Sequence, residues 1–542
     1  MEGCDILHLC LQPITDDDPL FSRKMKLISS RNLGSALRIP LSSTTDEALR
    51  GLERLVQAAR ILLLDEVELY FVEDDDPGPF SPRNELESLN SLLLVIDASL
   101  SRPVAGTVDV LLVLKEATLA MISKVGAPCT AYCISEGSDS NAEQLLLKWG
   151  EEQGVKTKLK ICHFKGAGRG AVALQNIDVG ATALEIPQSF IVCEELVYKS
   201  AMFDILKNLD GITAETMMLL WSMKERHDSN SQFKVYFDTL PKEFKTGLSF
   251  GIDALAALEG TVLLEEILQA KEHLHNQYDA LCPALCTNYP KVFQPELYTW
   301  DQFLWACELW YSNSMKVVFS DGKMRTCLVP IAGLLNHSFC PHILRYGKVD
   351  SATNSLKLNL SRPCREGEQC YLSYGSLPSS HLVTFYGFLP QEMHENPYDV
   401  IPLDFEASPD DEGSETPNGK SSWTTHMVRG TWMAKSKEHP TFGLPPPLLD
   451  HIRYLLLADG SEQTPEVLKQ VDVNKETERA VLETVLSIFN PMFEGIGVPD
   501  DLDRDGASWD VKLALDFKDL HRKIISSLLA SCSVGLQILG SL

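Results

Sequence analysis

Three short segments of this chain carry residue types that could bind a ligand or support a reaction. The first is Gly166-Ala167-Gly168-Arg169-Gly170, whose glycines lack a Cβ and so let backbone N–H and C=O groups approach a ligand closely. The second ends an apolar run with Asn336-His337-Ser338, and the third is a Gly-Glu-Gln turn followed by a short strand that ends on Tyr374. Taken singly, these segments are typical of a tight hairpin, a turn and the edge of an amphipathic strand. The first segment lacks a Gly-Lys-Ser/Thr and precedes a strand, which excludes dinucleotide and P-loop sites.

The order of these segments is more specific than any one of them. A glycine hairpin, then Asn-His-Ser, then Gly-Glu-Gln-x4-Tyr374-Gly, then Tyr386-Gly387-Phe388 resembles the SET-domain protein methyltransferases. A long helical insert, the segment SQFKVYFDTLP (231–241) and a helical tail point to the subgroup of the Rubisco large-subunit methyltransferases. The resemblance covers roughly residues 145–400 well and the tail loosely. It implies the α+β fold class. Within it, the resemblance implies a SET-domain β fold in which the Asn-His segment and the strand ending at Tyr374 cross as a pseudoknot.

The resemblance also implies a site for S-adenosyl-L-methionine and roles for individual residues. Tyr374 is expected to be catalytic, with a hydroxyl that orients the acceptor amine and the methyl group. The expected cofactor-binding residues are Gly166, Ala167, Gly168, Asn336, His337 and Tyr374. The expected substrate-binding residues are Ser312, Tyr386 and Phe388, with the Tyr386 ring as a wall of the lysine channel.

The chemistry expected at such a site is an in-line displacement at a methyl group, which requires alignment of the reacting atoms and exclusion of water. A lysine amine, with an ordinary pKa of about 10.4, must first lose its proton, and a desolvated channel favours the neutral form. We therefore expect an S-adenosylmethionine-dependent protein-lysine N-methyltransferase that acts on a non-histone protein. Histidine stays open as the acceptor, because the same channel could present an imidazole nitrogen.

Three departures from the family's pattern bear on substrate and activity. The family's Arg-Ser-Arg-like segment is Tyr311-Ser312-Asn313 here, and an Asp common three residues before the Asn is Gly333. The Asn that usually follows the catalytic Tyr loop is replaced in Ser379-Ser380-His381. Two cationic groups and one amide contact are thereby lost. These departures keep a second interpretation open, a catalytically weak or inactive SET fold that acts as a binding or scaffold module.

Three regions are expected to position these residues. Their boundaries are 1–145 for a helical N-terminal extension of unknown role, 146–400 for the SET domain, about 195–318 for its helical insert, and 401–542 for a C-terminal substrate-docking domain. In the first region, Thr44-x-x-Glu47 is a capping box that starts a helix ending near Leu64. In the last region, an acidic loop (407–422) is expected to precede helices from about Thr424.

The composition limits the partners. With 48 Lys+Arg against 75 Asp+Glu, the net charge of −27 repels phosphate backbones and anionic lipid surfaces. We therefore expect a protein partner, of basic character, and neither nucleic acid nor a membrane. The uncharged segment Ile524–Leu542 imitates a membrane anchor, but its serines and glutamine favour a helix whose apolar stripe closes a helical domain.

The 14 cysteines are scattered along the chain, which is typical of reduced thiols rather than of a disulfide framework. Cys129/Cys133 and Cys282/Cys286 could each present two thiolates, but no nearby His/Cys pair completes a zinc site, and no Cys-x-Cys cluster follows Tyr374. No metal is therefore expected. The N-terminal sequence has an acidic run at 16–18 and no basic region before a long apolar stretch, which favours the cytoplasm or nucleus.

Overall fold

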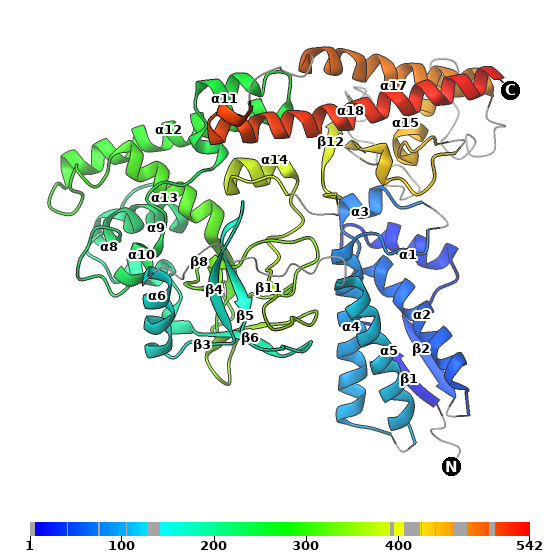
Figure 1. Cartoon of the computed structure of the whole chain (residues 1–542), viewed down its shortest axis with the longest axis horizontal. Coiled ribbons are helices and arrows are strands. Elements are labelled where there is room, and N and C mark those ends of the chain that lie inside the picture. The colour runs from blue at the N-terminus through cyan, green and yellow to red at the C-terminus, as the bar shows by residue number, and fades with distance from the viewer. Residues whose placement is uncertain are drawn as a thin grey trace.

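The computed structural model describes residues 6–541, apart from 41, 74–75, 105, 127–140, 391–394, 406–422, 424, 439–440, 459–473 and 498–503. The acidic segment 407–422 and the pair Cys129/Cys133 therefore lie outside the described residues. Figure 1 shows an N-terminal extension in blue, a central region with strands in cyan and green, and a tail whose long helices, in orange and red, run across the top of the view.

The N-terminal extension is mostly helical, but it also contains a two-stranded sheet that the sequence analysis missed. Strands β1 (Ile6–Cys10) and β2 (Ala36–Pro40) pair antiparallel, with Ile6 opposite Pro40. In β1 only Leu7 and Leu9 are buried, so its alternating pattern is too short to stand out in the sequence. The helices of this region are α1 (Phe21–Ser30), α2 (Thr45–Leu62), α3 (Glu66–Tyr70), α4 (Pro82–Ser101), α5 (Val108–Gly126) and α6 (Asn141–Glu152).

Helix α2 begins at the predicted capping box. The hydroxyl of Thr44 accepts a hydrogen bond from the N–H of Glu47, and the Glu47 carboxylate accepts one from the N–H of Thr44. Apolar side chains of α2, α4 and α5 form a core that also includes Cys340 and Leu344 of the central region. The extension therefore packs on the central region through a core to which Cys340 and Leu344 contribute.

Two small antiparallel sheets form the central region. Their strand orders are β3-β6-β10-β9 and β11-β5-β4, and β4 and β5 make the predicted hairpin, with Phe164 opposite Gly168. The strands are β3 (Lys156–Thr157), β4 (Leu159–Phe164), β5 (Gly168–Ala173), β6 (Thr182–Pro187), β9 (Val349–Asp350), β10 (Ser355–Asn359) and β11 (Gln369–Cys370).

The segment before Tyr374 passes between two other segments of the chain. The N–H of Leu372 donates to the carbonyl of Asn336 (2.8 Å). On the other side, the N–H of His342 donates to the carbonyl of Tyr371 (3.0 Å). The N–H of Ser373 donates to the carbonyl of Ile343 (2.9 Å). The crossing predicted as a pseudoknot is present, an exception to the rule that connections do not thread through one another.

The helical insert lies between β6 and the Asn-His segment, but it ends earlier than the predicted residue 318. Ser314–Val318 is strand β7, paired with β8 (Met324–Leu328), and it follows helix α13 without a loop, which hid its alternating burial. Between β8 and the Asn-His segment, the apolar run forms the 3-10 turn η4 (Ala332–Leu334). The insert helices are α7 (Glu194–Tyr198), α8 (Phe203–Leu206), α9 (Ala214–Glu225), α10 (Lys234–Thr239), α11 (Ile252–Ala257), α12 (Val262–Asn288) and α13 (Trp300–Asn313).

The tail starts with a strand rather than with the helix predicted from about Thr424. Strand β13 (His426–Arg429) pairs with β12 (Val400–Leu403), and helices α15 (Pro446–Ala458), α17 (Lys475–Ile496) and α18 (Trp509–Ser541) follow. Among the described residues, α18 is the one helix long and apolar enough to cross a membrane by length and composition alone. Its Ile525, Leu528 and Cys532 are buried in a core shared with α15 and α17, as predicted for a helix that closes a helical domain.

Candidate active site

The glycine turn between β4 and β5 presents its backbone to open space. Gly166 and Gly168 have φ values of +77° and +67°, which residues with a Cβ rarely adopt. No atom lies within 4 Å of the position that a Cβ would take on either glycine. The N–H of Ala167 donates to the carbonyl of Phe164 (3.3 Å) and closes the turn. All three residues are therefore placed where backbone groups can meet a ligand.

Gly170 brings this hairpin against the Asn-His segment. A Cβ on Gly170 would lie 2.5 Å from Nε2 of Gln369 and 2.8 Å from Nδ2 of Asn336, so only glycine fits there without a shift of these side chains. Both amide nitrogens are buried and have no hydrogen-bond partner in the part of the chain that the structure describes. The sequence analysis assigned no role to Gly170 or Gln369, although both stand in the motifs that it singled out. Their importance depends on contact across strands, which spacing alone does not reveal.

His337 connects the Asn-His segment to the strand that ends at Tyr374. Its Nδ1 accepts a hydrogen bond from the N–H of Tyr374 (3.1 Å), which places the ring proton on Nε2. The Nε2 group is buried and has no partner. Burial lowers the pKa of His337 to about 4, so the ring is neutral near pH 7. His337 therefore offers a neutral, unused hydrogen-bond donor.

Tyr374 lies at the centre of a stack of rings. Its ring stacks on His337 at 5.1 Å between centroids and on Tyr386 at 4.9 Å, with interplanar angles of 27° and 23°. Its hydroxyl donates to the carbonyl of Leu335 (2.8 Å). Burial, and then the neighbouring Tyr386 and Tyr346, raise the pKa of Tyr374, so its hydroxyl keeps its proton. Tyr374 can therefore orient a reacting group but is not a base.

Tyr386 and Phe388 extend this stack from the next turn of the chain. Tyr386 ends the π-helical turn η5 (Leu382–Tyr386), a distortion often found at functional sites, and its ring meets that of Phe388 at 6.5 Å and 79°. Tyr346 lies beside the strand that ends at Tyr374, because its hydroxyl donates to the carbonyl of Ser373 (3.0 Å). The sequence analysis missed Tyr346, since no motif surrounds it.

Two solved structures share this arrangement of chain. The SET domain of LSMT bound to lysine and AdoHcy aligns with a TM-score of 0.54 and 22% identity over 75% of this chain and 94% of that chain. Rubisco LSMT bound to AdoMet aligns with a TM-score of 0.53 and 21% identity over 74% and 94%. This chain has a SET-domain fold. The predicted resemblance and the predicted fold class are thereby confirmed.

Curated sequences resemble the SET region as well, although no protein-family model matches the chain. A chloroplastic [fructose-bisphosphate aldolase]-lysine N-methyltransferase of Arabidopsis thaliana is 26% identical over 46% of this chain and 52% of the relative. The Rubisco large subunit N-methyltransferase of Pisum sativum is 27% identical over 49% and 55%, and actin-histidine N-methyltransferase of Canis lupus familiaris is 25% identical over 45% and 42%. The chain thus spans about half the length of the curated relatives it matches.

Ser312, a predicted substrate-binding residue, forms its hydrogen bonds within its own helix end, on a helix whose Tyr311 packs against Phe385 of the π-helical turn. It lies near the end of α13, where its hydroxyl donates to the carbonyl of Glu308 (2.6 Å) and accepts from Nδ2 of Asn313 (2.7 Å). Among the described residues, no hydrogen bond or ring contact joins Ser312 to Tyr374, Tyr386 or Phe388. Ser312 therefore lies on a helix that borders the π-helical turn, and its role as a substrate contact stays a prediction.

Two of the departures from the family's pattern lie next to each other. A Cβ on Gly333 would be 3.2 Å from Oδ1 of Asn313. Positions 313 and 333 are therefore neighbours in space. The cation common in the family at the first and the carboxylate common at the second are both absent here, so neither position keeps a charge without its counterpart. The neighbouring Tyr311 ring packs edge-on against Phe385 at 5.4 Å.

One cluster in the SET domain has the composition of a metal site. The ligand atoms of His342, Cys364 and Cys370 lie within 4.8 Å of one another, and all three residues are buried. Both ring nitrogens of His342 are already engaged, because Nδ1 accepts from the N–H of Tyr371 (3.1 Å) and Nε2 pairs with Glu368 (2.9 Å). His342 and Arg362 hold the pKa of Glu368 at about 2 despite its burial. We interpret the cluster as a hydrogen-bonded network in the pseudoknot.

Proposed function

We propose that this chain is an S-adenosylmethionine-dependent protein-lysine N-methyltransferase. The observation that carries the proposal is the Tyr374–Tyr386 ring stack beside a glycine hairpin whose neighbours, Asn336 and His337, carry buried donors without partners. The names of the lysine methyltransferases that resemble this chain, and the SET fold of the solved structures, support it.

The residues present fit the cofactor. Buried polar groups in proteins nearly always have partners, so the unpartnered Nδ2 of Asn336 and Nε2–H of His337 are suited to acceptors on a bound molecule. The open face of the Gly166–Gly168 turn offers backbone groups to the same molecule. When bound, S-adenosylmethionine supplies a methyl group activated by a sulfonium. Gly166, Ala167, Gly168, Asn336 and His337 would hold it.

The protein's own contribution to the reaction is orientation and exclusion of water. The Tyr374 hydroxyl is anchored on the carbonyl of Leu335 and keeps its proton, so it can direct an amine without ionising. The stacked rings of Tyr374 and Tyr386 provide apolar walls, which favour the neutral form of a lysine amine and an aligned approach. Phe388 and Ser312 are proposed as substrate contacts, Ser312 through a more distant part of the substrate.

The substrate is proposed to be a non-histone protein of basic character. The relatives are named for action on aldolase, the Rubisco large subunit and actin. A net charge of −27 would speed encounter with a basic partner, although such steering affects rates more than identity. We further propose that the C-terminal helices dock this substrate, and that the protein works in the cytoplasm or nucleus, which a fluorescent fusion would test.

A histidine acceptor is the second candidate. It is favoured by the similarity to actin-histidine N-methyltransferases over 45% of this chain. The neutral ring stack would accommodate an imidazole nitrogen as readily as an amine. The position of the methyl group in the product separates the two candidates.

The test is transfer of tritiated methyl from S-adenosylmethionine into proteins of a cell lysate, with labelled bands identified by mass spectrometry. Tyr374→Phe removes the orienting hydroxyl and is expected to lower transfer by about 100-fold or more. Tyr278→Phe is the matched control, because it removes a tyrosine hydroxyl of the helical insert that donates to the carbonyl of Tyr298 (3.2 Å) and does not belong to the stack. Cofactor binding by calorimetry should persist in Tyr374→Phe.

Label that appears with wild type and Tyr278→Phe but not with Tyr374→Phe would establish the enzyme and show whether lysine or histidine is modified. Cofactor binding with no label in any lysate would instead favour the scaffold interpretation. Equal labelling by Tyr374→Phe and wild type would contradict the role given to Tyr374.

A further inference from the structure

The N-terminal extension meets the SET domain beside the predicted cofactor residues. The first residues of α4 and the residue before it, Ser81, Pro82 and Arg83, line a small cavity whose opposite side is formed by His337, Phe339 and Gly375. Its volume is about 10 Å³, space for a single water molecule. The extension lies outside the resemblance to other SET proteins. Only a cavity the size of a water molecule separates it from Gly375, the residue after Tyr374.

His337, one of the residues that line this cavity, also carries an unused donor. His337 is only 9% exposed, and its buried Nε2 has no partner among the described residues. The same residue binds the backbone of Tyr374 through its other ring nitrogen. His337 thus belongs both to the predicted cofactor residues and to the lining of a cavity that the extension helps to enclose.

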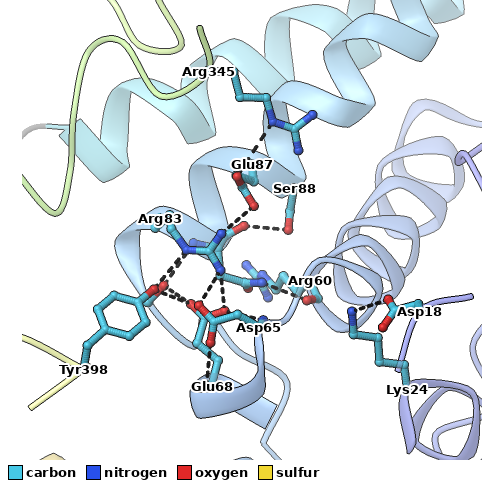
Figure 2. Close-up of polar contacts among 12 residues, drawn as sticks. Asp18, Lys24, Arg60, Asp65, Glu68, Arg83, Glu87, Ser88, Arg345 and Tyr398 are labelled. Carbon is cyan, nitrogen blue, oxygen red and sulfur yellow. Dashed lines mark hydrogen bonds and ion pairs between the residues drawn. The ribbon is translucent and has the colours of Figure 1, made fainter. Parts of the chain in front are cut away.

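Arg83 is the centre of a buried ionic cluster that fixes this part of the extension (Figure 2). Its Nη2 contacts the carboxylates of Asp65 (3.0 Å) and Glu68 (2.8 Å), and its Nη1 contacts Glu87 (2.9 Å). Glu68 also accepts a hydrogen bond from the hydroxyl of Ser81. The guanidinium of Arg83 thereby holds helix α3 against helix α4, and through Glu68 it also holds Ser81, which lines the cavity.

The remaining donor of Arg83 reaches across to the SET region. Its Nε donates to the hydroxyl of Tyr398 (2.9 Å), as Figure 2 shows. The hydroxyl of Tyr398 also donates to Glu68 (3.5 Å), and its ring packs with Phe339 and Leu382 in a cluster. Tyr386, Phe388 and Val67 of helix α3 pack against the same cluster. A continuous set of contacts therefore joins Arg83 to the rings of the candidate active site.

We propose that the N-terminal extension forms a wall of the cofactor site beside His337, and that Arg83 is the positioning residue that holds this wall in place through Tyr398. The inference rests on the proposed function, because the resemblance to SET methyltransferases assigns His337 to the cofactor. Arg83 itself does not contact the cofactor, since its three nitrogens are already bonded to side chains of the cluster.

The test uses the full chain and three variants, titrated with S-adenosylmethionine by calorimetry. Arg83→Met is expected to raise the Kd about tenfold or more, and Tyr398→Phe, which removes only the bridging hydroxyl, about threefold to fivefold. The control is Lys115→Met, which removes a basic residue of the same extension that pairs with Asp97 at a partly exposed site (2.7 Å). It should bind like wild type. Tyr398→Phe should melt within about 2 °C of wild type, so a change in its Kd reports positioning rather than unfolding.

Hydrogen exchange without cofactor gives a second readout. Amides of residues 374–388 should exchange faster in Arg83→Met and Tyr398→Phe than in wild type or Lys115→Met. Faster exchange confined to residues 65–101, or an unchanged Kd in Tyr398→Phe, would overturn the proposal. A wild-type chain that does not bind S-adenosylmethionine would contradict the proposed function and the cofactor wall together, whereas binding that is equal in all four proteins would contradict the wall alone.

Discussion

Two buried polar clusters lie a short distance apart in this molecule, and they differ in whether their donors have partners. Around Gly170, the nitrogens Asn336 Nδ2, His337 Nε2 and Gln369 Nε2 are buried and unpaired. Around Arg83, the guanidinium donates to three carboxylates and to Tyr398. Because a buried polar group without a partner costs stability, an unpaired cluster indicates a ligand site and a saturated one indicates a structural joint.

The clusters also differ in charge. The ring stack beside Gly170 is neutral, since burial keeps His337 unprotonated and the Tyr374 hydroxyl protonated. The Arg83 cluster is ionic, and its carboxylates raise the pKa of Arg83 in spite of burial. The neutral stack suits the approach of a neutral amine, whereas the ionic joint holds two regions in register.

The largest effect on stability is expected where the saturated cluster is broken. Arg83→Met leaves the Glu68 carboxylate, whose side chain is 2% exposed, without its cation, and removal of one partner from a buried ion pair costs about 3–5 kcal/mol. Native-state hydrogen exchange of α4 amides measures this loss. The double variant Arg83→Met/Glu68→Gln removes the stranded charge and should recover part of it. If the double variant were no better than the single one, the cluster would owe its stability to packing rather than to paired charge.

Asp399 provides an intermediate case, a buried carboxyl that has partners but is still costly to ionise. It accepts hydrogen bonds from the N–H (2.6 Å) and hydroxyl (2.8 Å) of Ser379, yet burial raises its pKa to about 6. Since the folded pKa exceeds the unfolded one, this group's stabilising contribution is complete below pH of about 3.9 and is lost as the pH rises through about 6.

The corresponding variant is Asp399→Asn, which cannot ionise. Its free energy of unfolding, relative to wild type, should rise by about 3 kcal/mol between pH 4 and pH 7 and then level off. Urea unfolding of both proteins across this range measures the difference, and the comparison cancels the titration of all other groups. A difference that stays constant with pH would mean that Asp399 ionises normally in the folded protein.

The smallest effect on stability is expected where the unpaired cluster is changed. Asn336→Ala removes an amide whose Nδ2 has no partner, so the free energy of unfolding should change by less than about 1 kcal/mol. Cofactor affinity should nevertheless fall about tenfold, which corresponds to about 1.4 kcal/mol. Thermal melting and calorimetry give the two numbers. A large loss of stability with unchanged affinity would reverse the contrast between the clusters and place Asn336 in a structural role.

The elements that the sequence predicted well are those specified by neighbouring residues. The Thr44–Glu47 capping box and the glycine turn of the β4–β5 hairpin depend on contacts within a few positions. The family motif also predicted that Tyr374, His337 and Tyr386 carry the site, and the structure brings their rings together.

The features that escaped the sequence depend on contacts between distant segments. Tyr346 lies beside the strand of Tyr374 only through the fold, because its hydroxyl donates to the carbonyl of Ser373. Ser312 was placed by analogy of motif, but its hydroxyl is bound to its own helix. Most of all, the contact of Arg83 with Tyr398 spans 315 residues, and no local pattern in the extension predicts it.

The shared core of the extension and the SET domain has a consequence for synthesis of the chain. The thiol of Cys340 donates to the carbonyl of Val125, 215 residues earlier, and Leu344 packs in the same core. At about 5–20 residues per second, a ribosome needs roughly 10–40 s to make that intervening chain. During this interval the helices of the extension are already synthesised, but Cys340 and Leu344, which cover part of their apolar surface, are not. The extension therefore completes its folding only after this part of the SET domain has been made. Until then the nascent chain exposes an apolar helical surface to which we expect chaperones to bind.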